Sequence, residues 1–164
     1  GAAPQLDHVA TSTQMQTQAQ TPTASSSPQL LEPFPTIFWV THPLAKALIS
    51  KLELESFGKE LEQRLQTDAE ALQSMQVAHA AYGQARHAMI HDADWIWIRQ
   101  RKWEAAFGAN RGVAGIRNTR SIKCLHAHTA HYWSGCEDNV VGRWVTERLQ
   151  TELATMTIPK KTGK

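Results

Sequence analysis

Cysteine is scarce in this sequence. Only Cys124 and Cys136 occur among 164 residues, which argues against a disulfide-stapled secreted scaffold, so we expect an intracellular protein, in the cytoplasm or an organelle. Twelve residues of continuous helix would hold the two cysteines roughly 18 Å apart, whereas a disulfide needs Cα atoms about 4.4–6.8 Å apart. We therefore expect both thiols to be free.

Long apolar runs and a strong net charge are also missing. The apolar runs are of core size and fall short of the roughly eighteen residues that a membrane span needs, so we expect no membrane contact. The formal net charge is only +2, but residues 95–123 hold seven Lys or Arg against one acidic residue. The adjoining stretch 117–133 adds three histidines and a cysteine, so a functional surface is expected here.

Composition divides the chain into three parts. Residues 1–32 contain no Lys or Arg and are rich in Gln, Thr and Ser. Such a segment buries too little apolar area to offset the entropy of ordering it, so a flexible arm is expected. Residues 33–156 are expected to form one folded domain, for which the length suffices. Residues 157–164 form an expected basic tail.

The pattern of residues 33–156 predicts a mainly α fold, a single compact domain of about four or five helices. Two prolines precede a β-prone run, so residues 36–41 are expected to form a short extended or β segment against the helices. Pro43 suits the first position of a helix that Thr41 or His42 can cap. The alternative is a small α+β fold in which the 36–41 segment pairs with a second strand.

Caps and apolar stripes place the later helices. Asp68 can cap a long third helix, whose apolar stripe leaves His79 and Arg86 facing outward. A further helix is expected to start near residues 118–121 and to carry the histidine-rich stretch. A polar residue at 138–139 can cap the last helix.

Basic side chains at the expected start of the histidine-rich helix predict an anion site. The positive end of a helix disfavours Lys and Arg by about 0.3–1 kcal/mol each, yet Arg117, Arg120 and Lys123 stand there. The glycine loop that ends at Gly115 leaves backbone amides free. We expect these four residues to bind a phosphorylated small molecule or an acidic protein surface, without catalysis. The alternatives are a carboxylate from elsewhere in the fold, or solvated charge.

A metal site is the second hypothesis. At about 100° per residue, Cys124, His128 and His131 fall within roughly 60° of one another on a helix, whereas His126 points to the opposite side. His42 is the natural further ligand from another segment, and zinc or iron would be the ion. Alternatively, Cys124 is a small buried residue and the histidines form ordinary hydrogen bonds.

Two further functions stay open. Cys124 could be a nucleophile near a helix N-terminus with a histidine such as His126 beside it, as in cysteine-dependent hydrolases, although no acidic orienting partner is readable. Residues 92–103 (DADWIWIRQRKW) interleave tryptophans with basic residues, as in single-stranded nucleic-acid binders. The chain is less basic than a dedicated binder, and packing residues of an inserted helix explain the same pattern, so nucleic acid is not the favoured partner.

Three segments together resemble one known family. They are residues 33–43 (PFPTIFWVTHP), 115–131 (GIRNTRSIKCLHAHTAH) and 138–145 (DNVVGRWV). In order and spacing they are similar to the mainly bacterial family called domain of unknown function 501 (DUF501). The family's recurring residues fall here on the following positions: Phe34, Pro35, Thr36, Trp39, Pro43, Lys123, Cys124, Leu125, His126, Ala127, Gly142 and Arg143.

The resemblance implies a shared fold unit and site, and no reaction. Many family members carry Cys at the position of His42, and this replacement keeps the character of a metal ligand. Members also often carry a Cys-Pro segment before the Phe-Pro-Thr element, where this chain reads SSSPQLLE (25–32).

Overall fold

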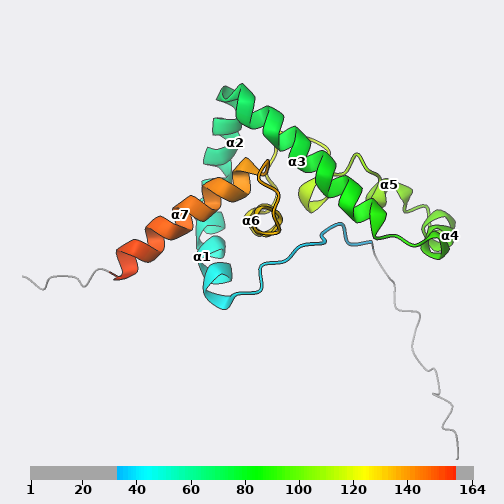
Figure 1. The fold of residues 1–164 in the computed structure, drawn as a ribbon, viewed down its shortest axis with the longest axis horizontal. Coiled ribbons are helices and arrows are strands. Elements are labelled where there is room, and N and C mark those ends of the chain that lie inside the picture. The colour runs from blue at the N-terminus through cyan, green and yellow to red at the C-terminus, as the bar shows by residue number, and fades with distance from the viewer. Residues whose placement is uncertain (1–32, 158–164) are drawn as a thin grey trace, which may run out of the picture. The chain divides into compact units, whose positions relative to one another are not determined.

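A computed structural model describes residues 33–157, which fold as a mainly helical domain (Figure 1). Helices hold 69% of these residues, and no strand occurs among them. The predicted mainly α class is confirmed. There are seven α-helices in the described part, where four or five were expected, and the short helices α4 and α5 account for most of the difference. The expected arm (1–32) and residues 158–164 of the expected tail lie outside the described part.

The chain enters the domain as an extended segment, residues 33–42, as predicted for 36–41. This segment crosses the C-terminal half of α3 (Ala69–Ala88). The Ile37 amide donates to the Tyr82 hydroxyl at 2.8 Å, and the Arg86 guanidinium donates to the Pro35 carbonyl at 3.2 Å. Phe38 meets the Tyr82 ring edge-on, with centroids 5.7 Å apart.

Three consecutive helices follow. α1 (Pro43–Leu54) begins with proline after His42, whose Nδ1 accepts from the Ala45 amide at 3.4 Å. α2 (Phe57–Thr67) follows a tight turn at Ser56, which has φ 63°. α3 begins after Asp68, whose carboxylate accepts from the Ala71 amide at 2.9 Å. The predicted caps His42 and Asp68 are therefore confirmed.

α3 buries two residues for which the sequence predicted an outward position. His79 is 4% exposed and Arg86 is 2% exposed. The prediction was wrong because a loop covers this face of α3: the Arg86 guanidinium donates to the carbonyls of Gly108 and Arg111, at 2.9 and 2.5 Å. His79 Nδ1 accepts from the Val113 amide at 3.1 Å. Main-chain carbonyls thus accept from both terminal nitrogens of the buried Arg86 guanidinium, while its Nε has no hydrogen-bond partner among the described residues.

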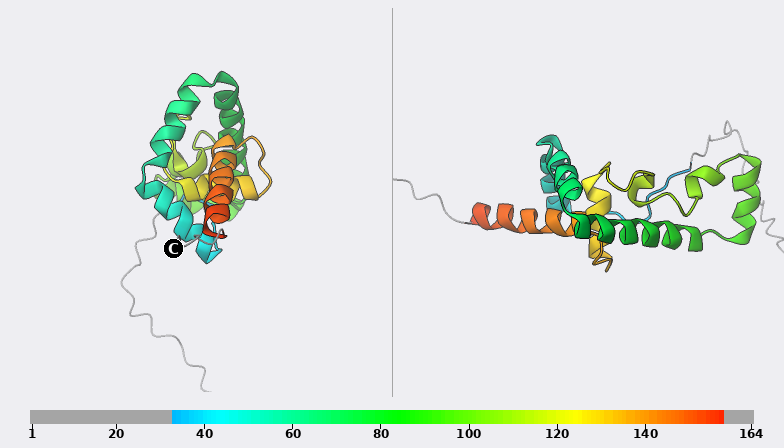
Figure 2. Two further views of the ribbon diagram at one scale, coloured as in Figure 1. Left: turned by 90° about the vertical axis from the view of Figure 1, so that its left-hand side faces the viewer. Right: turned by 90° about the horizontal axis from the view of Figure 1, so that it is seen from above.

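Two short helices and a 3-10 turn connect α3 to the histidine-rich region. They are α4 (Asp92–Gln100), α5 (Glu104–Phe107) and η1 (Val113–Gly115). α4 lies at the end of α3 that is remote from α2 (Figure 1, Figure 2). Gly115 has φ 74° and its Cα faces the Pro35 ring, so glycine is required both for the turn and for this close approach.

α6 (Leu125–Trp133) starts later than the predicted 118–121. Residues 117–124 are instead a loop, in which the Arg120 amide donates to the Asn118 side chain at 3.1 Å. The Ile122 amide donates to Glu62 of α2 at 2.6 Å. Because these side chains satisfy the amides, the loop does not need helical hydrogen bonds.

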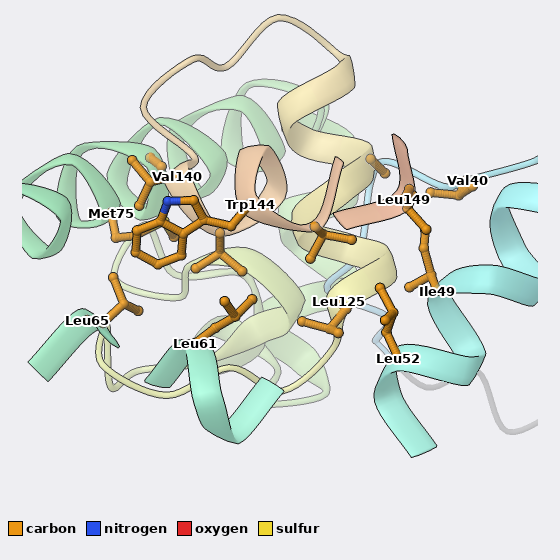
Figure 3. Close-up of a cluster of buried hydrophobic side chains, with 14 of the residues drawn as sticks. Val40, Ile49, Leu52, Leu61, Leu65, Met75, Leu125, Val140, Trp144 and Leu149 are labelled. Atoms are coloured by element: carbon orange, nitrogen blue, oxygen red, sulfur yellow. The ribbon is translucent and has the colours of Figure 1, made fainter. Parts of the chain in front are cut away.

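α7 (Val140–Thr157) packs against α6 and completes the core. The Asn139 side chain accepts from the Gly142 amide at 3.0 Å, so the predicted cap at 138–139 is confirmed as Asn139. The main core lies between α1, α2, α3, α6 and α7, as Figure 3 shows. Its labelled side chains are Val40, Ile49, Leu52, Leu61, Leu65, Met75, Leu125, Val140, Trp144 and Leu149. Among the described residues, no helix combines the length and apolar character that crossing a membrane requires.

Gly142 sets the distance between α6 and α7. A Cβ atom at this position would collide with the His128 carbonyl oxygen and would lie 2.5 Å from Tyr132 Cβ. Gly142→Ala should therefore destabilise the domain by about 1–3 kcal/mol, the usual cost of an overpacked core, measured by urea denaturation.

Gly58→Ala is the matched control. Its added methyl group would make ordinary contacts, 3.9 Å from Leu125 Cδ2, so stability should stay equal or rise by up to about 1 kcal/mol. Equal unfolding midpoints for the two variants would contradict the close approach at Gly142.

Candidate functional site

The residues predicted to bind an anion lie in the loop before α6. Arg117, Arg120 and Lys123 are exposed and, within residues 33–157, take part in no salt bridge. Since α6 begins only at Leu125, they do not occupy its first turn, and the expected opposition between their charge and the helix dipole does not arise. Gly115 closes the 3-10 turn, and its carbonyl accepts from the Arg111 side chain at 3.2 Å.

Glu53 of α1 occupies the N-terminus of α6 instead. One carboxylate oxygen, Oε1, accepts from the Leu125 amide at 2.7 Å. A carboxylate at this end of a helix satisfies a free amide and interacts favourably with the helix dipole. This carboxylate contacts the Leu125 amide and His126 and forms no salt bridge with Arg117, Arg120 or Lys123, so it is not the carboxylate partner that the alternative to the anion site requires for these basic residues.

The same carboxylate brings together three potential metal ligands. Glu53, Cys124 and His126 each offer a ligand atom, and these atoms all lie within 4.8 Å of one another. His126 Nδ1 is 3.3 Å from Glu53 Oε2. Ligand atoms around a tetrahedral zinc ion lie roughly 3.3–3.8 Å apart, so only a slight closure would be needed.

Cys124 and His126 share this site because of the late start of α6. The sequence argument placed them on opposite sides of a helix, but Cys124 is the N-cap residue, with extended backbone angles (φ −154°, ψ 116°). Its side chain therefore departs from the helical positions that about 100° per residue would assign to it. The Cys124 thiol therefore lies close to Glu53 of α1 and to His126 in the first turn of α6.

The His126 ring has an acceptor at both of its nitrogens. Nε2 lies 3.2 Å from the Lys46 carbonyl oxygen and Nδ1 faces the Glu53 carboxylate at 3.3 Å. In the tautomer that donates from Nε2 to the Lys46 carbonyl, the Nδ1 lone pair is directed at a carboxylate unless a cation lies between them. A proton or a metal ion can fill that place. Metal-binding histidines commonly donate their other N–H to a main-chain carbonyl in this way.

The Cys124 thiol is not activated in the metal-free protein. Burial raises its pKa most strongly; the Ala127 and His126 amides lower the pKa, and the nearby Glu53 carboxylate raises it. A nucleophilic cysteine requires the opposite shift. Both Cys124 and Cys136 are free, as expected.

The other predicted metal ligands do not converge with Cys124. His128 and His131 are 0% and 4% exposed and lie on the core side of α6. His42 caps α1 and lines a separate surface pocket with Leu44 and Trp133. The structure therefore places the four residues of that hypothesis in three different environments.

Asn139 joins the two buried histidines. Its side-chain oxygen lies 3.2 Å from His128 Nδ1, and its side-chain nitrogen lies 3.1 Å from His131 Nδ1. An amide oxygen accepts and an amide nitrogen donates, so His128 carries its hydrogen on Nδ1 and His131 on Nε2. Both rings are neutral in this arrangement. His79 is also neutral, because its Nδ1 accepts from the Val113 amide.

Burial lowers the pKa values of the three histidines, to about 4 for His79, about 3 for His128 and about 4 for His131. The charge of a protonated His131 would further lower the pKa of His79, and both His79 and His131 further lower the pKa of His128. The unfolded chain takes up these protons near pH 6.5. Because the unfolded state then binds more protons than the folded state, stability is fully present above pH 6.5 and is lost as the pH falls towards 4.

Acid should therefore destabilise the domain before most carboxylates titrate. Between pH 6 and pH 5, the free energy of unfolding should fall by about 1.4 kcal/mol per pH unit for each buried histidine. Urea denaturation at a series of pH values measures this slope. His79→Gln should lower the slope by about one proton, whereas exposed His87→Gln should leave it unchanged; a flat profile in the wild-type chain would contradict neutral burial.

Two cavities meet at Lys123 and Cys124. The first, the polar cavity, has a volume of about 410 Å³. It is lined by Glu53, Ser56, Gly58, Lys59, Glu62, Ile122, Lys123, Cys124 and Leu125. The second, the aromatic cavity, has a volume of about 270 Å³. It is lined by Phe34, Pro35, Thr36, Phe38, Trp39, Ala114, Lys123, Cys124, His126 and Ala127. The ligand cluster thus lies in the wall between two hollows.

The tryptophan-rich run is separate from this site. On α4 only Ile98 is buried, while Ile96 and Trp97 are 57% and 59% exposed. The Arg101 guanidinium lies 5.6 Å from the centroid of the Trp97 ring. It also lies 5.0 Å from the centroid of the Trp103 ring, which follows the end of the helix. Arginine side chains thus already cover part of the aromatic surface that a nucleic acid would stack on.

Glu53 is the site residue that the sequence argument missed. It lies 72 residues before Leu125, at the C-terminal end of α1, where it is the only acidic side chain of the helix. No local spacing rule links it to Cys124 or His126. Only the packing of α1 against α6 places its carboxylate at the start of the later helix.

A protein-family model described as "Protein of unknown function (DUF501)" matches residues 8–147. The chain belongs to this family. Of the positions that the DUF501 resemblance emphasised, Phe34, Trp39 and the run 123–127 line the two cavities beside the ligand cluster or belong to it, and Gly142 packs against α6 at His128 and Tyr132. No curated protein and no solved structure shows a significant match to the chain.

Proposed function

We propose that this DUF501 protein binds a divalent transition-metal ion, zinc in the first place, through Glu53, Cys124 and His126. The observation that carries the proposal is the orientation of the His126 ring. Its Nε2 lies 3.2 Å from the Lys46 carbonyl oxygen and 3.4 Å from the Ser50 hydroxyl oxygen, and its Nδ1 is directed at the Glu53 carboxylate and the ligand cluster. This geometry is relieved by a cation placed among the three ligand atoms.

The donor set favours zinc. A thiolate, an imidazole and a carboxylate together are ligands that zinc accepts, and iron is the second choice. Three protein ligands leave a fourth position open, which is the arrangement of catalytic zinc sites and differs from the closed arrangement of structural ones. The polar and aromatic cavities on either side give that position access to a ligand.

Metal binding would change the protonation state of the Cys124 thiol. Burial and the Glu53 carboxylate keep Cys124 protonated in the metal-free protein, but a coordinating thiol loses its proton. Cys124 then serves as a ligand, and the hydrolase hypothesis in which it attacks a substrate loses its nucleophile. The loop side chains Arg117 and Arg120 have no part in this proposal.

Removing a ligand should weaken metal binding. The full-length chain, dialysed against Co(II) as a spectroscopic substitute for zinc, should bind about one equivalent and show a thiolate-to-cobalt charge-transfer band. Cys124→Ser should abolish this band, and His126→Gln and Glu53→Gln should each weaken binding by at least about tenfold, since even the partners of ligands contribute about 10–100-fold.

Two variants serve as controls. Cys136→Ser removes the other free thiol, which is also half-buried, and His42→Gln removes the more distant histidine. Both should bind Co(II) like the wild type. Circular dichroism of every variant confirms folding. Loss of the band in Cys136→Ser but not in Cys124→Ser, or a folded wild-type chain without the band, would refute the proposal.

A further inference from the structure

The aromatic cavity has an unusual wall. Phe34 and Trp39 are 62% and 64% exposed, yet their rings stack on each other, with centroids 5.3 Å apart and planes inclined by 13°. Together with Phe38 and Ala127 they enclose a mainly apolar hollow. Exposed apolar surface that lines a hollow is typical of a ligand site and less typical of a solvated face.

One end of this cavity is polar. Lys123, Cys124 and His126 belong to its lining, and the last two are ligands of the proposed metal. Lys123 forms no salt bridge within the part of the chain that the structure describes. A molecule in the cavity would thus have an apolar body beside the aromatic rings and a polar end beside Lys123 and the open coordination position.

The charge of this end selects a monoanion. A divalent ion, the Cys124 thiolate and the Glu53 carboxylate sum to zero, so Lys123 leaves one positive charge. A single carboxylate neutralises it, whereas a phosphate monoester at neutral pH carries nearly two negative charges and leaves an excess. Carboxylates are also ordinary ligands of zinc.

We infer that the site binds a small monocarboxylic acid with an aromatic or branched apolar body. The carboxylate occupies the open metal position beside Lys123, and the body lies in the aromatic cavity against Trp39. The volume of about 270 Å³ is just below the range of about 300–1,000 Å³ for ligand pockets, so an acid about the size of benzoate fits. This inference rests on the proposed metal site.

The test uses the full-length chain loaded with Co(II) and three probes: benzoate, acetate and phenyl phosphate. Benzoate should change the cobalt absorption spectrum with an affinity at least about tenfold higher than that of acetate, because only benzoate fills the apolar hollow. Phenyl phosphate has the same ring and should bind more weakly than benzoate. Equal affinities for benzoate and acetate, or tighter binding of phenyl phosphate, would overturn the inference.

Matched variants locate the probe. Trp39→Ala should remove the preference for benzoate over acetate, whereas Trp97→Ala, at a tryptophan of similar exposure on α4, should keep it. Lys123→Met should weaken both acids, whereas Lys59→Met, which changes only the polar cavity, should not. An equal effect of Trp39→Ala and Trp97→Ala would exclude the aromatic cavity.

The two proposals fail in different ways. If the wild-type chain gives no cobalt spectrum, the metal site fails and the acid site fails with it. If the cobalt spectrum forms but does not respond to benzoate, the metal site stands and only the acid site is overturned.

Discussion

The carboxylate of Glu53 is the constraint on which the site depends. α6 begins where it does because this carboxylate, from a helix 72 residues earlier in the chain, accepts from the first amide of the helix. A free helix end would need water or a local cap, and Cys124, at the N-cap position, forms no capping hydrogen bond with its side chain. His126, whose Nδ1 lies 3.3 Å from the Glu53 carboxylate, lies on the first turn of the same helix. The Glu53 side chain thus contacts both the first amide of α6 and the His126 ring of the candidate ligand cluster.

The two sides of α6 use histidine in different ways. On the core side, Asn139 holds His128 and His131 in fixed neutral tautomers, and no solvent reaches His128. On the α1 side, His126 is partly exposed and has an acceptor at each nitrogen. Asn139 occupies the Nδ1 atoms of both buried rings, so these two nitrogens are not directed at a common point outside the core. For this reason the three histidines of one short helix do not form one metal site.

Sequence reasoning succeeded where the signal was local. The caps His42, Asp68 and Asn139 precede apolar repeats, and a capping side chain acts on amides only two or three residues away. The reasoning failed where the partner was distant in the chain. Arg86 is buried because four carbonyls from the extended segment and the 108–112 loop surround it, and no periodicity of α3 encodes those carbonyls.

The start of α6 shows how one such error propagates. A helix from 118–121 would have placed Arg117 and Arg120 against its dipole and set Cys124 opposite to His126, and both site hypotheses followed from that start. In the structure, the Glu62 carboxylate accepts a hydrogen bond from the Ile122 amide, and the helix begins only at Leu125. The basic residues therefore lie in a loop, and the Cys124 thiol lies near His126. The residue types had indicated the region in which the candidate ligand cluster lies, whereas the predicted ligand set depended on a helix boundary, which sequence patterns place only to within a few residues.

The three segments that resemble the DUF501 family meet around α6. Residues 33–43 supply the aromatic rings of the cavity, and residues 123–127 supply its polar end and the start of the helix. The segment 138–145 packs behind, where Gly142 lets α7 approach the His128 carbonyl. A larger residue at Gly142 would collide with the His128 carbonyl and with Tyr132, so α6, which carries His126 and follows Cys124, would have to move relative to α7. The close packing on one side of the helix is thus a condition for the ligand geometry on the other.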